Sequence, residues 1–520
     1  MTGTANPGSG LLPARTARPI RSGERIHVVG AAGAGASAAV LHAAWAGAAV
    51  DGCDPGGPTS YTSPIEALGV PLAWEHDAVH VTRSPAPERL AVTKALTAIA
   101  PDHPELTAAR AAGIAIEPWQ QVIADAAAGR RLVGVAGTHG KSTTAGWLVH
   151  VLVEAGLDPS AFVGALLPAS LTGGIGPATA RRGTGDAFVV EADEYAGNFD
   201  PYRPDVVLLT SIEWDHPDVF ADRSAVAAAF EAWLRAVPDA TLVANLGDAG
   251  VDELVRRLAD RPGPVIAVQV EVQQEARDRT NPQRAIAVTP RPIRGSEIDR
   301  YVSGTAWVDR PDRTNLWLVD HATDAHLVDT TVQLVGAHNA ANAAVVAGGA
   351  LALGVHPDAI ASGLTSFGGV GRRLERLGET AGVVVYDDYG HHPTAIRVTL
   401  DAVRQREPGR RIWAVYEPLT YHRTAAMLEA FADALMTADA VAIADIWAGR
   451  DPDTTVTSAA ALAGAVAHRN PTIPAAAPGS VEATAAWLAG EVRAGDAVLV
   501  MGGGKSSLIG RLLLEALADR

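Results

Sequence analysis

The sequence predicts an α/β fold built from three domains, on three observations. The chain has 520 residues, which is more than one hydrophobic core usually organises. Segments that begin near residues 25 and 131 each read as a strand, a glycine-rich turn and a helix, and strands alternate with helices again from residue 381. We therefore expect domains at residues 25–128, 129–366 and 367–520, after a disordered tail at residues 1–24.

Composition excludes two classes of partner. A net charge of −16 with no run of lysine and arginine excludes nucleic acid. No stretch of about 18 uncharged apolar residues occurs, so we expect no membrane insertion. The first residues lack the apolar core of a secretory signal and the chain has one cysteine, so a cytoplasmic location is expected. That cysteine, Cys53, is expected to be a small buried residue rather than a nucleophile.

The first predicted domain opens with RIHVVGAAGAGASAAVLHAAWAGAAVDGCDP, which reads as a βαβ unit whose second strand ends at Asp54. Its turn, from Gly30 to Gly35, is close to the G-x-G-x-x-G pattern of dinucleotide-binding turns. Ala32 replaces the second glycine, which makes close approach to a pyrophosphate less assured. Nucleotide binding and a tight turn that packs small residues are equally compatible with this segment.

The second predicted domain opens with the turn VAGTHGKSTT at residues 135–144, which contains one of only three lysines in the chain, Lys141. The N–H groups of such a turn and the start of the following helix attract anions, and Lys141 adds a charge that can neutralise phosphate. The hydroxyl of Ser142 or Thr143 can hold Mg²⁺. Val135 stands where the general P-loop pattern has glycine, so the match to that pattern is partial.

Later segments extend this organisation. Short alternating runs between residues 242 and 333 predict added β-strands on the central domain. The third domain begins with the strand GVVVYDD and ends with AVLVMGGG leading into a last helix. Residues 502–507 are interpreted as a loop that caps this helix, with a second phosphate site as the less favoured alternative.

Four further clusters of acids, imidazoles and amides stand where predicted strands end. They are EADEY at 191–195, SIEWDHPD at 211–218, GAHNAAN at 336–342 and DDYGHHPT at 387–394. Any one of them is explained by helix caps or structural histidines. Helix caps and structural histidines do not explain the occurrence of all four clusters together with GTHGKS.

With FGGVGRR at residues 367–373, these motifs in this order resemble the Mur ligase family, the ATP-dependent amide ligases of peptidoglycan synthesis. The resemblance runs from about residue 25 to the end of the chain. It implies a Rossmann-like UDP-binding domain, a central P-loop ATPase domain and a C-terminal Rossmann-like domain. It also implies ATP and Mg²⁺ as cofactors and UDP-N-acetylmuramate and L-alanine as substrates. We expect a monomer or weak homodimer.

The resemblance assigns roles to individual residues. The implied ATP-binding residues are Gly137, Thr138, His139, Gly140, Lys141, Ser142, Thr143, His338, Asn339, Arg373 (or Arg372) and Asp387. The implied metal ligands are Ser142, Glu191 and His216. The implied contacts to the UDP substrate are Gly30, Gly33, Gly35, Ser37 and Asp54.

The family phosphorylates a carboxylate with ATP, and an amine then attacks the acyl phosphate. Lys141 is implied to neutralise the meeting anions, and a neutral His391 or His392 to position the amine or take its proton. A helix-start turn explains the two histidines equally well. In EPLTYHRT, residues 417–424, Arg423 is implied to bind the amino acid, but Leu419 stands where the family has histidine.

Three alternatives remain at this point. A recycling ligase of the same family would join a tripeptide to UDP-N-acetylmuramate; L-alanine is preferred to it. The second alternative belongs to another class of function: an ATP-gated binding protein, in which ATP binding drives a conformational change without ligation. Such a protein does not need Asp387, His391 and Asn339 to be supplied by separate segments of the chain. A dehydrogenase has support only from the imperfect turn at Gly30.

Overall fold

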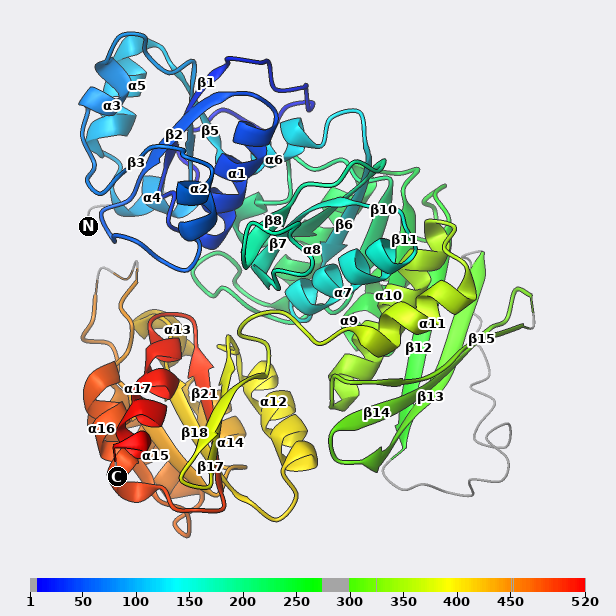
Figure 1. Cartoon of the computed structure of the whole chain (residues 1–520), viewed down its shortest axis with the longest axis vertical. Helices are drawn as coiled ribbons and strands as arrows, with labels where there is room; N and C mark the ends of the chain where they lie inside the picture. Colours follow the sequence, from blue (N-terminus) through cyan, green and yellow to red (C-terminus); the bar gives the residue numbers. More distant parts are fainter. Residues whose placement is uncertain (1–6, 274–298, 324, 450, 452, 520) are drawn as a thin grey trace.

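The computed structural model describes residues 7–273, 299–323, 325–449, 451 and 453–519, which form three sheets, each with helices around it (Figure 1). The sheets have five, ten and six strands, and each falls within one of the three predicted domains. The first domain, in blue, and the third, in yellow to red, both lie beside the middle domain (Figure 1). The predicted α/β class with three domains is confirmed.

The first domain is built on a parallel sheet in the order β3-β2-β1-β4-β5. Its strands are β1 (Arg25–Val29), β2 (Ala49–Cys53), β3 (Leu72–Ala73), β4 (Arg89–Val92) and β5 (Ala115–Pro118). Its helices are α1 (Ala34–Trp45), α2 (Ser63–Ala67), α3 (Val79–Thr82), α4 (Lys94–Ile99), α5 (Pro104–Ala112) and α6 (Trp119–Ala126). The strand order reverses direction at β1, so the glycine-rich turn after β1 stands at the edge where α/β folds bind ligands.

Residues 7–24 are ordered against this domain, so the prediction of a disordered tail is wrong for them; residues 1–6 lie outside the described residues. Arg15 forms ion pairs with Glu117 and Asp125, at 2.8 and 2.7 Å. Arg18 pairs with Glu24 at 2.6 Å, and Glu24 is buried. The arginines of this segment neutralise carboxylates that the domain buries. Taken without those partners, the same arginines make the segment look polar and unstructured.

The middle domain has a mixed sheet in the order β15-β14-β13-β12-β11-β10-β6-β9-β7-β8. Its strands are β6 (Arg131–Ala136), β7 (Ser160–Leu167), β8 (Ala178–Arg181), β9 (Ala187–Ala192), β10 (Val206–Leu209), β11 (Thr241–Asn245), β12 (Val265–Gln273), β13 (Arg300–Arg310), β14 (Arg313–Asp320) and β15 (Ala325–Val332). Its helices are α7 (Lys141–Glu154), η1 (Tyr195–Gly197), α8 (Arg223–Arg235), α9 (Ala249–Arg257), α10 (Ala337–Ala352) and α11 (Pro357–Ser366). Strands β12–β15 are the predicted additions; the part of the predicted segment at residues 274–298 lies outside the described residues.

The third domain has a sheet in the order β16-β17-β21-β18-β19-β20, parallel except for the edge strand β16. Its strands are β16 (Glu375–Thr380), β17 (Val383–Asp388), β18 (Arg411–Glu417), β19 (Ala440–Ala444), β20 (Ala475–Gly479) and β21 (Asp496–Gly502). Its helices are α12 (Pro393–Arg406), α13 (Tyr421–Ala426), α14 (Leu428–Leu435), α15 (Ala459–Arg469), α16 (Val481–Glu491) and α17 (Ser506–Ala518). Strands β17, β19 and β21 are buried along their whole length, which explains their unbroken apolar runs.

Helix α10 lies close on the middle sheet because it carries glycine where a side chain would collide. A Cβ at Gly348 would lie 2.7 Å from Val243 Cγ1, and one at Gly349 would lie 2.7 Å from Leu208 Cδ2. This contact fixes the position of α10 on the sheet. Asn339, in the first turn of the helix, therefore lies beside the sheet edge that carries the candidate site. Among the described residues, no helix has the length and apolar character needed to cross a membrane.

We predict that Arg89→Ala destabilises the first domain by roughly 3–5 kcal/mol, because it leaves buried carboxylates without their partner. The Arg89 side chain is 4% exposed and pairs with Glu24, Glu117 and Asp125. Denaturant unfolding of the full chain measures the effect. Arg21→Ala is the control, since its side chain is 66% exposed and should matter little. Equal effects of the two substitutions would contradict the importance of burial.

Candidate active site

The turn between β6 and α7 adopts a conformation that only glycine permits at two positions. Gly137 has φ +132° and Gly140 has φ +80°. A Cβ at Gly137 would lie 2.2 Å from Thr210 Oγ1, and one at Gly140 would lie 2.6 Å from Asn342 Oδ1. The turn is therefore held between the end of β10 and the start of α10.

Backbone bonds fix the outer part of this turn. Thr138 N donates to Ser211 O at 2.9 Å, and His139 N donates to Ser211 Oγ at 2.9 Å. Thr143 follows on the first turn of α7 and is buried. The first N–H groups of α7 have no carbonyl within the helix to bond, so they form the anion-attracting part of the turn.

Lys141 is the first residue of α7, and its ammonium group lies between acids that follow β9. Its Nζ donates to Glu194 Oε2 at 2.9 Å and lies 3.4 Å from Asp193 Oδ1. Burial disfavours the charged form, but Glu194, Asp193 and Glu191 outweigh it and hold the pKa of Lys141 above its usual value. The side chain is 12% exposed, so Lys141 provides a permanent positive charge in a largely enclosed place.

Ser142 and Glu191 form a second polar group next to Lys141. Ser142 Oγ donates to Glu191 Oε1 at 3.0 Å, and Gly164 N donates to the other carboxylate oxygen at 2.5 Å. Arg373 of the third domain donates from Nη2 to Ser142 Oγ at 2.9 Å. A hydroxyl and a carboxylate that share a hydrogen bond are ligand types that suit Mg²⁺.

His216 gathers with Asp193 and Glu194, and the ligand atoms of the three lie within 4.8 Å of one another. Glu194 Oε1 and His216 Nδ1 are buried without a hydrogen-bond partner among the described residues. Such unpartnered buried atoms are expected where a cation completes a site, so the residues present fit a divalent metal. The three predicted metal ligands thus fall in two groups, with Glu191 beside Ser142 and His216 beside the other acids.

His139, Glu213 and His392 form a further cluster across the boundary between the middle and third domains. His139 Nε2 lies 2.8 Å from Glu213 Oε2, and His392 Nδ1 lies 3.7 Å from the same oxygen. His392 also caps α12 by accepting from Thr394 N at 3.2 Å, while its Nε2 lies 3.1 Å from Trp214 O. Both ring nitrogens of His392 are therefore occupied, which favours the helix-start interpretation for this residue.

His391 differs from its neighbour in how its ring is used. Its Nδ1 lies 2.8 Å from the carbonyl oxygen of Tyr389, which favours the tautomer with the proton on Nδ1 and a lone pair on Nε2. Burial, followed by the nearby charge of Arg423, holds the pKa of His391 well below its usual value. Burial, followed by His139, lowers the pKa of His392 to about 4. Both rings are neutral near pH 7, but only His391 has a ring nitrogen that can accept a proton.

The start of α10 lies beside the turn. Asn339 Nδ2 donates to Val335 O at 2.8 Å, and its Oδ1 accepts from Asn342 Nδ2 at 3.2 Å. Burial, followed by His139, lowers the pKa of His338 to about 4. Asn339 is thus held rigidly by protein groups, although it also borders the cleft described below.

The two arginines of the 367–373 motif reach different partners. Arg372 donates from Nε to Asp387 Oδ2 at 3.0 Å, whereas Arg373 reaches Ser142 in the middle domain. Both guanidinium groups lie over the ring of Tyr389, at 5.0 and 5.1 Å from its centre. Burial raises the pKa of Asp387 to about 6 despite the Arg372 partner.

The residues predicted to bind the UDP substrate are divided by the structure. Gly30 N donates to Cys53 O at 2.8 Å, and Gly33 is exposed. Asp54 Oδ2 accepts from Ala32 N at 3.1 Å, so it holds the turn. By contrast, a Cβ at Gly35 would lie 2.2 Å from Trp119, and Ser37 is fully buried with its Oγ 3.1 Å from Thr179 Oγ1. Gly35 and Ser37 therefore serve the packing of α1, not the open side of the turn.

Arg423, on α13, is buried and pairs with Asp215, which follows β10 of the middle domain. Its Nε has no hydrogen-bond partner among the described residues, so one donor remains available. The guanidinium group of Arg423 already holds the carboxylate of Asp215, so an amino acid can bind only to its remaining donors.

A cleft of about 960 Å³ opens where the three domains meet. Its lining includes Tyr61, Leu166, Asn339, Arg373, Asp387 and Lys505. Gly504, Lys505 and Ser507 therefore face the same cleft as the predicted nucleotide contacts. Sequence reasoning missed Tyr61, for which it held no signal. It included Glu213 in the cluster at residues 211–218 but gave it no role.

Three family profiles match consecutive parts of the chain. "Mur ligase family, catalytic domain" matches residues 25–131, "Mur ligase middle domain" matches 135–350, and "Mur ligase, glutamate ligase domain" matches 372–504. The UDP-N-acetylmuramate--L-alanine ligase of Roseiflexus sp. (strain RS-1) is 35% identical over 95% of this chain and 99% of its own. This chain belongs to the Mur ligase family. The enzyme of the same name from Frankia casuarinae is also 35% identical, over 95% of this Mur ligase and 98% of its own chain.

Solved structures support the same fold. The UDP-N-acetylmuramate-alanine ligase of Thermotoga maritima has a TM-score of 0.71 at 21% identity and covers 94% of this chain and 98% of its own. The murein peptide ligase of Psychrobacter arcticus has a TM-score of 0.67 at 23% identity, with coverage of 96% and 99%. Because these identities are low, the two structures establish only the Mur ligase architecture. They do not show whether the amine substrate is L-alanine or a tripeptide.

We predict that raising the pH from about 4 to 7 destabilises this Mur ligase relative to its Asp387→Asn variant. The pKa of Asp387 is raised from 3.8 to about 6, so the folded chain binds more protons than the unfolded chain in this range. Stability from this carboxyl is present at low pH and lost as pH rises, by roughly 3 kcal/mol at most, since one pKa unit is about 1.4 kcal/mol. Melting temperatures of both proteins across this range check it; a gap that does not change with pH would contradict it.

Proposed function

We propose that the protein is an ATP-dependent ligase that joins L-alanine to UDP-N-acetylmuramate through an acyl phosphate in peptidoglycan precursor synthesis. The observation that carries the proposal is the full-length similarity to relatives of that name, from Roseiflexus, Frankia and Kineococcus, at 35–36% identity over 95% of this chain. The cytoplasmic location and the monomeric or weakly dimeric state remain predictions from the sequence.

In this proposal the turn at residues 137–143 binds the ATP phosphates. The start of α7 supplies N–H donors, and Lys141 leaves Glu194 and Asp193 to meet the terminal phosphate. Ser142 with Glu191, and His216 with Asp193 and Glu194, would hold Mg²⁺ in the two groups that they form, and the ion would neutralise phosphate charge when bound. Asn339, Arg373 and Asp387 contact the nucleotide from around the cleft that they border.

The remaining residues act on the other two substrates. The turn at Gly30 receives the UDP group, and its N-acetylmuramate carboxylate reaches the phosphates across the interdomain cleft. His391 accepts the proton of the incoming amine on Nε2, since burial keeps its ring neutral. Arg423 takes the carboxylate of the amino acid through its available Nε donor.

The direct test is to incubate the full chain with UDP-N-acetylmuramate, ATP and Mg²⁺, to offer L-alanine, glycine, L-serine and the tripeptide in separate reactions, and to measure phosphate release. The proposal expects L-alanine to give the largest kcat/KM. A preference for the tripeptide would assign the chain to the recycling reaction. ATP hydrolysis that no amine stimulates would support the ATP-gated binding protein.

We predict that Lys141→Ala lowers kcat about 10²–10³-fold, because an oriented charge on the transferred phosphoryl group is lost. This substitution also leaves Glu194 without its partner, so the double variant Lys141→Ala/Glu194→Gln is the control for folding. The double variant should melt near the parent temperature and the single variant below it, and both should show the lowered kcat. Turnover near the parent rate in the folded double variant would refute the assignment.

A second substitution, Arg423→Lys, keeps the charge but loses the planar fork of the guanidinium group. We predict that it raises the KM for L-alanine at least about 10-fold more than the KM for ATP, since lysine has no counterpart of the Nε donor that binds the carboxylate of the amino acid. Saturation curves in each substrate measure this split. Arg404→Lys is the control, because Arg404 lies on the exposed surface of the same domain. An unchanged KM for L-alanine would remove Arg423 from the acceptor site.

A further inference from the structure

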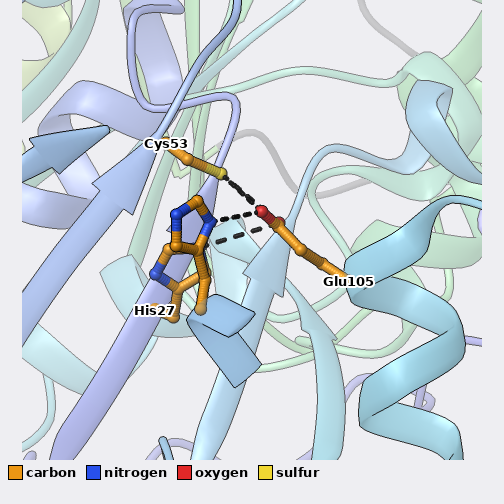
Figure 2. Close-up of side chains that lie close together, drawn as sticks. His27, Cys53 and Glu105 are labelled. Carbon is orange, nitrogen blue, oxygen red and sulfur yellow. Dashed lines mark hydrogen bonds and ion pairs between the residues drawn. The ribbon is translucent and has the colours of Figure 1, made fainter. Parts of the chain in front are cut away.

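The first domain contains a second cluster of metal-binding side chains, separate from the turn at Lys141. It consists of His27 on β1, Cys53 at the end of β2, His80 on α3 and Glu105 on α5, which we call the Cys53 cluster. One ligand atom from each residue lies within 4.8 Å of the others. Figure 2 shows the His27 ring and Cys53 Sγ both directed at the Glu105 carboxylate.

The distances around Glu105 are short. Cys53 Sγ lies 3.2 and 3.3 Å from its two oxygens, His80 Nδ1 lies 2.7 Å from Oε1, and His27 Nε2 lies 3.7 Å from Oε2. Tetrahedral zinc binds nitrogen and oxygen at about 2.0–2.2 Å and sulfur at about 2.3 Å, which separates its ligands by roughly 3.3–3.8 Å. The four atoms need only small shifts to take up these positions.

His27 is oriented as a metal ligand would be. Its Nδ1 lies 3.0 Å from Asp51 Oδ1, and Asp51 is itself paired with Arg83, so the proton is placed on Nδ1. The opposite nitrogen, Nε2, is buried and has no hydrogen-bond partner among the described residues. In metal sites, a histidine usually donates from one ring nitrogen to a carboxylate and binds the metal with the other. Asp51 and the buried Nε2 of His27 match this arrangement.

Charge also favours a cation here. His27 is 1% exposed and Glu105 is 0% exposed at their side chains, and Cys53 is buried. Burial opposes ionisation of Glu105, but the nearby His27 ring and the hydrogen bonds from His80 and Cys53 outweigh it and bring its pKa to about 2. A dication would balance this carboxylate and a thiolate at once, with both histidines neutral, so that no net charge is buried.

We propose that the Cys53 cluster binds one Zn²⁺ ion as a closed structural site with four ligands. Binding forms a bond from Cys53 Sγ to the metal and releases the thiol proton to solvent. A thiolate and imidazoles select zinc over Mg²⁺, which prefers the oxygen ligands around Ser142. The two metals are thereby assigned to different domains.

The site has a mechanical consequence for its surroundings. Helix α3 has only four residues, and His80 joins it to β1, β2 and α5 through the metal. The carbonyl of Cys53 also accepts hydrogen bonds from Gly30 N and Ala31 N, at 2.8 and 3.0 Å. Zinc at Cys53 therefore holds the base of the glycine-rich turn as well as α3.

An adjoining set of residues offers a different ligand combination. His76, His103 and Glu105 also bring ligand atoms within 4.8 Å of one another, and neither ring nitrogen of His103 has a hydrogen-bond partner among the described residues. This set contains no sulfur of its own, but Cys53 Sγ also lies 3.2 Å from His76 Nδ1, so loss of metal affinity in the His80→Asn variant, and not the thiolate signal alone, distinguishes the two. We assign the ion to the Cys53 cluster because it provides four ligands instead of three.

Cobalt provides the test, because Co²⁺ bound to a thiolate gives a charge-transfer band in the near ultraviolet. Cys53 is the only cysteine of the chain, so the band reports on this residue alone. The full chain is freed of metal with a chelator and titrated with Co²⁺, and Zn²⁺ is then added to displace it. The proposal expects the band to saturate at one equivalent and to vanish with one equivalent of Zn²⁺.

Three variants complete the experiment. Cys53→Ser should abolish the band, and His80→Asn, which changes a partly exposed helix position, should weaken Zn²⁺ affinity by at least about 10–100-fold, the loss seen even for outer contacts. His356→Asn is the control, since the side chain of this histidine is 76% exposed at the N-cap of α11. Absence of the band in the parent, or equal Zn²⁺ affinity in the parent and the folded His80→Asn variant, would overturn the proposal.

Discussion

Parallel pairing of β6 with β9 on one side and β10 on the other is the constraint on which the candidate active site depends. The register places Val135 opposite Glu191 and Ala136 opposite both Ala192 and Leu209. All three strands therefore end at one edge of the sheet, and the segments that follow them are brought together there. Lys141 follows the central strand, so it lies beside the acids after β9, and His216, which follows β10, approaches the same acids.

The third domain completes this edge through a few specific contacts. Arg373 bonds to Ser142, Arg423 pairs with Asp215, and His392 reaches Trp214 O. Each contact joins a polar group that follows β6 or β10 to a segment more than 170 residues later in the chain. The chemistry of the site therefore depends on the relative position of two domains, which is why a small number of cross-domain charges carries much of it.

Sequence patterns were sufficient for the fold class, the domains and the motifs at strand ends, because continuous apolar runs and glycine turns are local features. They were insufficient where a side chain finds its partner across the structure. The arginines of residues 7–24 look disordered in sequence because their carboxylate partners lie elsewhere in the chain. The resemblance implies that Ser37 contacts the UDP substrate, whereas the fold buries it where α1 packs on the middle domain. The residues of the Cys53 cluster lie between positions 27 and 105 with no short spacing, so no motif reveals them.

A crystal structure of the full chain with ADP and Mg²⁺ tests the central claim most directly, that the edge formed by β6, β9 and β10 is the phosphate site. The account predicts that the phosphates lie on the turn at residues 137–142, within hydrogen-bond distance of Lys141 Nζ, with Mg²⁺ on Ser142 Oγ. Nucleotide phosphates bound instead at the Gly30 turn or at residues 502–507, with Lys141 still paired to Glu194, would contradict it.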